Sequence, residues 1–540
     1  MASDSHSEKT SRLSRKSFGV TNRIWLIVSL FLFIILFTRL IQPSSSSNGP
    51  KVDFANLKPK NYLNASGADE PNPFEFCPIY GRGDELSTKY GPVTLAKTRL
   101  HLGSGARIQR VIRRAMTGQP LTVSVIGGSV SACHGAGDDP LAPRCYPSRF
   151  FQWWNSIFPH PASELTNGAM RRTNSDYFGF CNGHHIPDNV DLIIVELDAD
   201  DAASEQAFEN FELLIRSILM RPDQPAVIML GHFSPQTHDT YAFAGPDHWH
   251  NIVSQFYDVP HISTKPILYP DYISDPTSIQ KYYADPVLAN PSGHEILADV
   301  LIAYLQTQIC SAYNAGTGRT VDILPMLSGD APKQPTDARG LFGGIGQRKG
   351  AAAGADSGGS AVDLDVSNAV YAQMRVPPAR VNTRTKDVRP FEEVAPYCVS
   401  ANDLINPLPP SLFYGSGWHA HQPATGSNSL QSSAHYWFST LPTSKIRIPM
   451  KIGAGDIGIY YLREPRSAVG QEGSGVECWV DDNYPGARKI FNAADIGEAT
   501  PTLEIIDHFV TRGSHFVECQ LLGEEGQSVP AFKIMGVFSS

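Results

Sequence analysis

The hydrophobic pattern of this chain changes along its length. From about residue 76 to 313, short and nearly continuous apolar runs alternate with segments whose apolar residues recur at helical spacing. The apolar runs cover residues 121–126, 190–197, 226–230 and 261–263. Because such runs between amphipathic helices indicate a parallel sheet covered on both faces, we expect an α/β domain at 76–313.

The last part of the chain, from about 371 to 540, has a different pattern. Its apolar residues alternate with polar ones over short runs, and residues 445–452 place three isoleucines and a methionine on one face. Short alternating strands with turn signals between them are typical of an all-β sandwich or jelly roll. The segment between the two regions, 314–370, is rich in Gly, Ala and Ser, and we interpret it as a disordered linker.

The amino-terminal region predicts a membrane anchor at 24–41. Residues 24–37 carry no charged side chain, Lys and Arg residues precede them, and a stalk of mostly Ser, Asn, Pro and Lys follows at 42–75. The basic residues predict a cytosolic tail at 1–23 and a single-pass type II topology. The rest of the chain would then lie in the ER or Golgi lumen, or on the extracellular face. A cleaved signal peptide is the alternative, although no clear A-x-A cleavage site follows.

The composition indicates the cellular compartment and excludes some classes of partner. The chain has 540 residues, a net charge of −9 and eight cysteines, all of them beyond the predicted anchor. An even number of cysteines fits an oxidising compartment, and Cys478 with Cys519 is a candidate local disulfide. Asn64 begins a glycosylation sequon. The acidic net charge does not indicate nucleic-acid binding. The chain has no P-loop, HExxH or CxxC motif, and we therefore predict no cofactor and no metal.

The candidate chemistry centres on Ser129. The segment 121–137, LTVSVIGGSVSACHGAG, ends a β-branched strand in two glycines and places Ser129 at the start of a small-residue turn. A serine at a strand-to-helix turn presents its hydroxyl at the carboxyl edge of a sheet, where unsatisfied backbone N–H groups can stabilise an oxyanion. Gly128 allows the tight turn and the close approach of a substrate. An ordinary Gly-Gly-Ser turn is the alternative.

Three further landmarks follow Ser129 in order. Gly168 lies in a turn-rich segment, an acidic run at 198–201 follows the second apolar run, and Asp285 precedes a Gly-His pair that ends at His294. This order resembles the SGNH, or GDSL-type, hydrolase superfamily, particularly its fungal-like membrane-anchored members with a C-terminal β domain. The resemblance implies a three-layer α/β/α fold, a Ser nucleophile, oxyanion donors in the second and third blocks, and a final Asp–His pair.

The residues of that superfamily do not all recur here. Ser129 matches the nucleophile and Gly168 matches the oxyanion donor of the second block, whereas Gly128 stands where many members have Asp. Asp200 stands at the position of the oxyanion Asn of the third block. A carboxylate cannot donate a hydrogen bond as an amide does, and it would repel an oxyanion unless it were protonated.

The last block lacks the expected base. Asp285 matches the family's Asp, but Leu288 stands where the catalytic His would be, and leucine cannot accept a proton. His294 is the nearest replacement base, with a structural role at the helix start as its alternative, and His134 is the next candidate. The histidines of the HWH segment at 248–250 are further candidates, and a metal pair there lacks other ligands.

Two hypotheses of function remain open. In the first, the chain is an O-acyl esterase or acyltransferase that acts on cell-wall or capsular polysaccharide through Ser129, His294 and Asp285, as the resemblance and the topology imply. In the second, loss of the family's His and Asn has left a catalytically inactive domain that binds a glycan or scaffolds a partner of the secretory pathway. We favour the first. An imidazole close to the Ser129 hydroxyl in the folded chain would support the first hypothesis, and its absence would support the second.

Overall fold

The structure is a computed structural model, and it divides into two compact units, Met1–Asp53 and Phe54–Ser540. In the first unit, β1 (Lys16–Ser17) and β2 (Val20–Thr21) form an antiparallel pair. Almost all of the predicted linker, and the sequon at Asn64, lie outside the described residues. The structure describes scattered residues from 16 to 33, and then 57–63, 72–317, 375–384, 391–393, 395–402, 417–421, 423, 434–453 and 455–540.

The predicted membrane anchor is described only in part. Its described residues between Ile24 and Phe33 are helical, and their large apolar side chains are exposed. Among the described residues, one helix is long and apolar enough to cross a membrane, α11 (Pro291–Gly316), and 83% of its apolar window is buried. A helix buried to this extent packs in a protein core, so α11 is not the predicted anchor. The anchor at 24–41 therefore stays a prediction.

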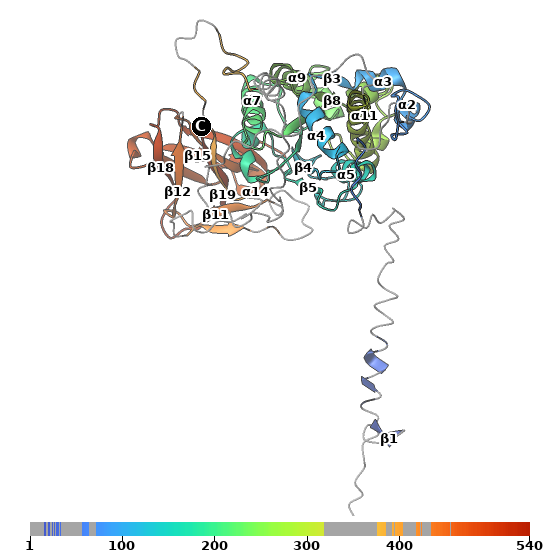
Figure 1. The fold of residues 1–540 in the computed structure, drawn as a ribbon. Coiled ribbons are helices and arrows are strands. Elements are labelled where there is room, and N and C mark those ends of the chain that lie inside the picture. Colours follow the sequence, from blue (N-terminus) through green and yellow to red (C-terminus); the bar gives the residue numbers. More distant parts are fainter. Residues whose placement is uncertain are drawn as a thin grey trace, which may run out of the picture. The chain divides into compact units, whose positions relative to one another are not determined.

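A six-stranded sheet forms the centre of the first large region (Figure 1). The strand order is β3-β8-β7-β6-β4-β5, and every pair is parallel except β3 with β8. The four predicted apolar runs are the neighbouring strands β4, β6, β7 and β8. The strands are β3 (Arg99–His101), β4 (Thr122–Gly127), β5 (Glu164–Asn167), β6 (Leu192–Glu196), β7 (Ala226–Gly231) and β8 (His261–Ser263).

Helices cover both faces of this sheet, as predicted. Successive side chains of β6 enter different cores: Leu192 and Ile194 pack with α4, α5 and α11, whereas Ile193 and Val195 pack with α6, α7 and α9. The region is therefore mixed α/β with a largely parallel sheet. The helices are α2 (Glu85–Tyr90), α3 (Pro92–Lys97), α4 (Ala106–Met116), α5 (Tyr146–Ile157), α6 (Ser175–Cys181), α7 (Glu205–Leu219), α8 (Pro235–Tyr241), α9 (Pro246–Tyr257), α10 (Lys265–Ser274) and α11.

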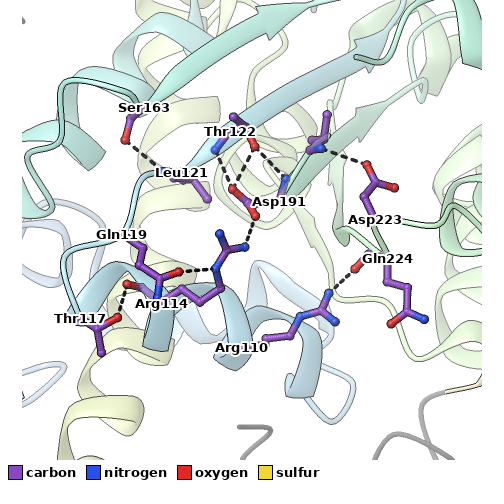
Figure 2. A network of polar contacts seen from close by, with 11 residues as sticks. Arg110, Arg114, Thr117, Gln119, Leu121, Thr122, Ser163, Asp191, Asp223 and Gln224 are labelled. Atoms are coloured by element: carbon purple, nitrogen blue, oxygen red, sulfur yellow. Dashed lines mark hydrogen bonds and ion pairs between the residues drawn. The ribbon is translucent and has the colours of Figure 1, made fainter. Parts of the chain in front are cut away.

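A polar network fixes the amino edge of the sheet (Figure 2). Asp191, just before β6, accepts hydrogen bonds from the N–H of Thr122 at 3.0 Å and from its hydroxyl at 2.9 Å, at the start of β4. Arg114 of α4 donates to the same carboxylate. These bonds hold β4 and β6 in register, and the register determines where both strands deliver their carboxyl ends.

The C-terminal region is all β, as predicted. A seven-stranded sheet follows the order β10-β11-β19-β13-β16, with β17 also paired to β13 and β9 to β19, and a four-stranded sheet follows the order β12-β18-β14-β15. Their inner faces enclose one core, and Cys478 of β14 forms the predicted disulfide with Cys519 of β18. The strands are β9 (Tyr397–Ser400), β10 (His419–His421), β11 (Tyr436–Ser439), β12 (Lys445–Ile452), β13 (Ile457–Pro465), β14 (Gly475–Val480), β15 (Arg488–Phe491), β16 (Ala493–Ala494), β17 (Thr500–Asp507), β18 (Gly513–Leu521) and β19 (Phe532–Ser539).

The two regions pack against each other and are covalently joined. The outer face of the seven-stranded sheet shares a hydrophobic core with α6, α7 and α9. A disulfide joins Cys181 at the end of α6 to Cys398 of β9, and the hydroxyl groups of Tyr177 and Ser400 hydrogen-bond at 2.6 Å. This junction was not predictable from the sequence, because a disulfide between residues 217 positions apart leaves no periodic signal. The remaining disulfides are Cys77–Cys310 and Cys133–Cys145.

Candidate functional site

Ser129 lies directly after β4, at the carboxyl edge of the sheet. The neighbours of β4 are β5 on one side and β6 on the other, so this edge is the switch point at which open α/β sheets bind ligands. The Ser129 hydroxyl donates to Asp200 Oδ1 at 3.1 Å, and its backbone N–H donates to Oδ2 of the same carboxylate at 2.9 Å. The hydroxyl oxygen accepts a hydrogen bond from the N–H of Arg172 at 2.8 Å.

Gly128 makes this close pairing possible. A Cβ atom at position 128 would lie 1.9 Å from Asp200 Oδ2, so any other residue would push the carboxylate away from Ser129. A larger residue could therefore not stand at position 128 beside an aspartate at position 200. The glycine at 128 and the aspartate at 200 are thus one structural feature.

Burial strongly affects the Asp200 carboxylate. It raises the pKa of Asp200 to about 6, while the two hydrogen bonds from Ser129 and the charge of Arg172 lower the pKa and the charge of Asp201 raises it. A carboxyl group with a pKa near 6 exchanges its proton close to neutral pH, as general bases do. Among the described residues, Asp200 is the only ionisable side chain that hydrogen-bonds to the Ser129 hydroxyl.

The predicted oxyanion donor Gly168 has its N–H in use. That group donates to the carbonyl of Val125 at 2.9 Å, which extends the pairing of β5 with β4. A Cβ atom at position 168 would lie 2.2 Å from the carbonyl oxygen of His185. This glycine is therefore required by packing, and in the present geometry its N–H does not face an acyl group.

His294 lies in the core, away from Ser129. Its side chain is fully buried at the start of α11 and stacks on the ring of Tyr146. Its Nδ1 accepts a hydrogen bond from the Tyr146 N–H at 3.3 Å. Burial, with smaller contributions from His232 and Arg149, lowers the pKa of His294 to about 3, so the imidazole is neutral. The predicted Ser129–His294 hydrogen bond is absent from the described contacts, and the geometry favours the structural alternative.

The other residues of the last block also have local partners. Asp285 Oδ1 accepts the N–H groups of Val287 at 2.8 Å and Leu288 at 2.7 Å, which closes the loop ahead of α11. The Leu288 side chain packs against the core that α4, α5 and α11 form on one face of the sheet. Asp285 therefore holds a turn, and no described contact joins it to an imidazole that could act on Ser129.

His134, the alternative base, belongs to a surface network. Its Nδ1 lies 2.6 Å from Asp138 Oδ1, and Arg171 contacts the same oxygen. The side chain is partly exposed. The chain brings His134 close to Ser129 in sequence, yet the described hydrogen bonds direct its ring to Asp138.

His250 has a role that the sequence did not reveal. Its ring lies between two buried carboxylates, with Nδ1 2.6 Å from Asp198 and Nε2 2.9 Å from Asp201, and it stacks on Phe211. Burial lowers the pKa of His250, but the hydrogen bonds and charges of the two aspartates outweigh it and raise the pKa to about 10. Asp198 and Asp201 thus form a clamp that holds His250 as an imidazolium. Within the described part of the chain, no three His, Cys, Asp or Glu side chains are placed to hold a metal ion.

Two further buried polar groups lie near the Ser129–Asp200 pair. Glu196, the last residue of β6, accepts a hydrogen bond from the Ser131 hydroxyl at 2.8 Å, and burial raises its pKa to about 8. Tyr460 of β13 belongs to the C-terminal region, and the charges of Asp176, Asp200 and Asp201 add to burial in raising its pKa. A glutamate at the end of an apolar strand is unusual, so the sequence could have pointed to Glu196 as a site residue. Nothing in the sequence predicted that Tyr460 lies near Asp200.

A small cavity of about 10 Å³, enough for one water, opens at the neighbouring strand ends. Asp198, His232, Ser263 and Lys265 are among its lining residues, and Ser129 is not. His232 Nε2 donates to the carbonyl of Val287 at 2.8 Å, and burial lowers the pKa of His232 to about 4. This neutral imidazole belongs to the cavity rather than to the serine.

Comparison with solved structures shows that the two-region architecture has a precedent. A two-domain esterase (CEX) active on acetylated mannans matches 82% of this chain and 98% of its own, with a TM-score of 0.54 and 16% identity. The same type of esterase co-crystallised with mannopentaose matches 82% of this chain and 97% of its own, with a TM-score of 0.53 and 16% identity. No protein-family model matches the chain, and no curated protein matches it. The chain therefore has the fold of a two-domain carbohydrate esterase.

Proposed function

We propose that this protein acts on acylated polysaccharide as an SGNH-like O-acyl esterase or acyltransferase with Ser129 as its nucleophile. One observation carries the proposal: at the switch point of the sheet, the Ser129 hydroxyl donates to a buried carboxylate, Asp200, whose pKa is about 6. The pair thus contains a nucleophile and a proton acceptor in contact. The shared fold with an esterase active on acetylated mannans supports a carbohydrate ester as the substrate class.

The proposed reaction uses Asp200 where related hydrolases use an imidazole. The Ser129 oxygen bonds to the acyl carbon while its proton passes to Asp200, and a tetrahedral intermediate forms. The sugar oxygen then leaves with the proton from Asp200, and the acyl group stays on Ser129. In a second step, water or an acceptor hydroxyl gives its proton to Asp200 as its oxygen bonds to the acyl carbon. The bond between that carbon and the Ser129 oxygen then breaks, the proton returns from Asp200 to Ser129, and a carboxylic acid or a new ester is released. As Asp200 turns toward the proton, the Ser129 N–H becomes available to the oxyanion.

Residues 24–41 place this activity on a membrane in our proposal. The described residues between Ile24 and Phe33 expose large apolar side chains, as a lipid-facing helix would, and four disulfides fit an oxidising lumen. We expect Asn64 to be glycosylated and the C-terminal region to resist protease added outside sealed microsomes. Cleavage of that region together with an unmodified Asn64 would reverse the proposed topology.

Three measurements on the purified full chain test the chemistry: hydrolysis of an activated acetyl ester, release of acetate from acetylated mannan, and fluorophosphonate labelling of Ser129. We expect Ser129→Ala to abolish all three. Asp200→Asn should lower hydrolysis by about 100-fold or more, since the hydroxyl loses its proton acceptor. His134→Ala is the matched control, because this surface imidazole does not contact Ser129, and it should retain wild-type activity.

A catalytically inactive glycan-binding protein is the second candidate function. It is favoured because Asp200 occupies both the N–H and the hydroxyl of Ser129, and because Val125 occupies the N–H of Gly168. In that case the wild-type chain would neither hydrolyse esters nor label, while acetylated mannan oligosaccharides would still bind in a calorimetric titration. If Asp200 only blocks the oxyanion site of an otherwise competent serine, Asp200→Asn would instead increase hydrolysis.

A further inference from the structure

We propose that Arg172 is a positioning residue through which the C-terminal β region holds the Ser129 hydroxyl in place. This inference rests on the proposed function, because it assigns a role to the β region in the chemistry of Ser129. It predicts that the β region is part of the active site, in addition to any part it takes in binding polysaccharide.

The first link runs through the backbone. The N–H of Arg172 donates to the Ser129 hydroxyl oxygen at 2.8 Å, and the hydroxyl is thereby directed toward Asp200. Arg172 adopts a φ of 51°, in the left-handed region that non-glycine residues rarely occupy. Such a conformation costs free energy, which the contacts of the residue must offset.

The second link runs through the side chain. The Arg172 guanidinium pairs with Glu498 and donates to the carbonyl of Ala499 at 3.3 Å. Both residues lie in the connection that enters β17 of the C-terminal region. The side chain and the backbone of one residue thus contact different regions of the protein: its guanidinium is bound by the β region, and its N–H contacts the nucleophile.

The β region is itself firmly attached at this place, so the contact has a fixed anchor. The Cys181–Cys398 disulfide and the Tyr177–Ser400 hydrogen bond join α6, which follows the Arg172 loop, to the β region. The other end of the loop is tied to the sheet, because the N–H of Met170 donates to the carbonyl of Gly127 at 3.0 Å. Loss of the Arg172 side-chain contacts would release the middle of a loop whose ends are fixed.

The charge of Arg172 adds a second, separable effect. Its guanidinium lowers the pKa of Asp200, against the larger opposite effect of burial. The ionisable groups nearest to Asp200 include Asp201 and Glu196, whose charges act in the opposite direction. Removing the Arg172 charge should therefore move the acid limb of the activity profile to higher pH, whereas a purely structural role for Arg172 would leave that limb unchanged.

The test compares Arg172→Ala, Arg172→Lys and Glu498→Gln in the full chain. We expect Arg172→Ala to slow fluorophosphonate labelling of Ser129 about tenfold, since small displacements of a nucleophile are costly. Glu498→Gln should slow it by about twofold to threefold, because the Arg172–Glu498 pair is exposed and the carbonyl of Ala499 still accepts from the guanidinium. Arg172→Ala should also move the acid limb to higher pH, while Arg172→Lys and Glu498→Gln should keep the limb of the wild type. Asp495→Ala is the control, because it breaks an exposed ion pair with Arg466 in the same connection.

Hydrogen–deuterium exchange of segment 170–175 provides a readout that needs no activity. We expect about tenfold faster exchange there in Arg172→Ala, about twofold to threefold faster exchange in Glu498→Gln because its ion pair is exposed, and no change in Asp495→Ala. Wild-type exchange and labelling in both variants would overturn the inference. If the wild-type chain neither labels nor hydrolyses esters, the proposed function fails, and the exchange measurement still decides whether the β region positions Ser129.

Discussion

Two acidic sites follow β6 within three residues of each other, and they are built in opposite ways. Asp198 and Asp201 enclose the imidazolium of His250, so their negative charges are compensated inside the protein. Among the described residues, the Asp200 carboxylate accepts hydrogen bonds only from the hydroxyl and N–H groups of Ser129, and burial raises its pKa to about 6 against the opposing charge of Arg172. One short acidic run thus serves two purposes, since Asp198 and Asp201 contact His250 whereas Asp200 contacts Ser129. The compensated site holds the fold, and the uncompensated carboxylate is available to take a proton.

The largest expected effect comes from breaking the compensated site. We expect His250→Leu to destabilise the protein by about 3–5 kcal/mol, because two buried carboxylates lose their shared cation. Chemical denaturation monitored by fluorescence measures this difference. His248→Leu is the control, since His248 is exposed two residues away on the same helix. A loss below about 1 kcal/mol for His250→Leu would show that the clamp does not carry the stability assigned to it.

Neutralising single carboxylates should give effects of opposite sign at the two sites. We expect Asp198→Asn to destabilise by about 1–3 kcal/mol, because the buried imidazolium of His250 loses a charged partner. Asp200→Asn should stabilise by about 1 kcal/mol at pH 7, because the ionised form of a group with a raised pKa is disfavoured by folding. Equal losses of stability in both variants, measured by the same denaturation, would erase the distinction between the sites.

The pH dependence of stability should reflect both sites in one direction. The folded-state pKa values of Asp200, Glu196 and His250 are about 6, 8 and 10, all above their ordinary values. Groups that bind protons more tightly when folded stabilise the protein below their unfolded pKa, and this contribution is lost as the pH rises through the folded pKa. We therefore expect the free energy of unfolding to increase by about 2–4 kcal/mol from pH 9 to pH 6.5. Below pH 6.5 the buried neutral His232 and His294, whose folded pKa values are about 4 and 3, act in the opposite direction. Glu196→Gln should flatten the part of the curve near pH 8.

The smallest effect is expected from placing a histidine at position 288. In Leu288→His, Asp285 would still be engaged with the N–H groups of its own loop, and Asp200 would still hold Ser129. Hydrolysis of an activated acetyl ester should therefore change by about twofold or less. A tenfold increase would mean that only the imidazole is missing and that Asp200 is not the working base.

The local architecture followed from the sequence to a large extent. Continuous apolar runs predicted the parallel strands of the α/β region, because a strand buried on both faces has no polar side. Alternation predicted the β sandwich, and the Gly-Gly-Ser turn predicted where Ser129 emerges from the sheet. Cys478 and Cys519 could be paired because both lie in short alternating strands of one region. Each of these inferences depends on residues that are close in sequence or share a periodicity.

The tertiary structure decided the chemistry around Ser129. The direction of each side chain in the acidic run, the burial of His294 against Tyr146 and the use of the Gly168 N–H by Val125 all depend on contacts between distant segments. The Cys181–Cys398 junction and the reach of Arg172 to Glu498 depend on how two separately patterned regions dock. A sequence records which groups are present, but hydrogen bonds and burial set their pKa values and partners, and these exist only once the chain is folded.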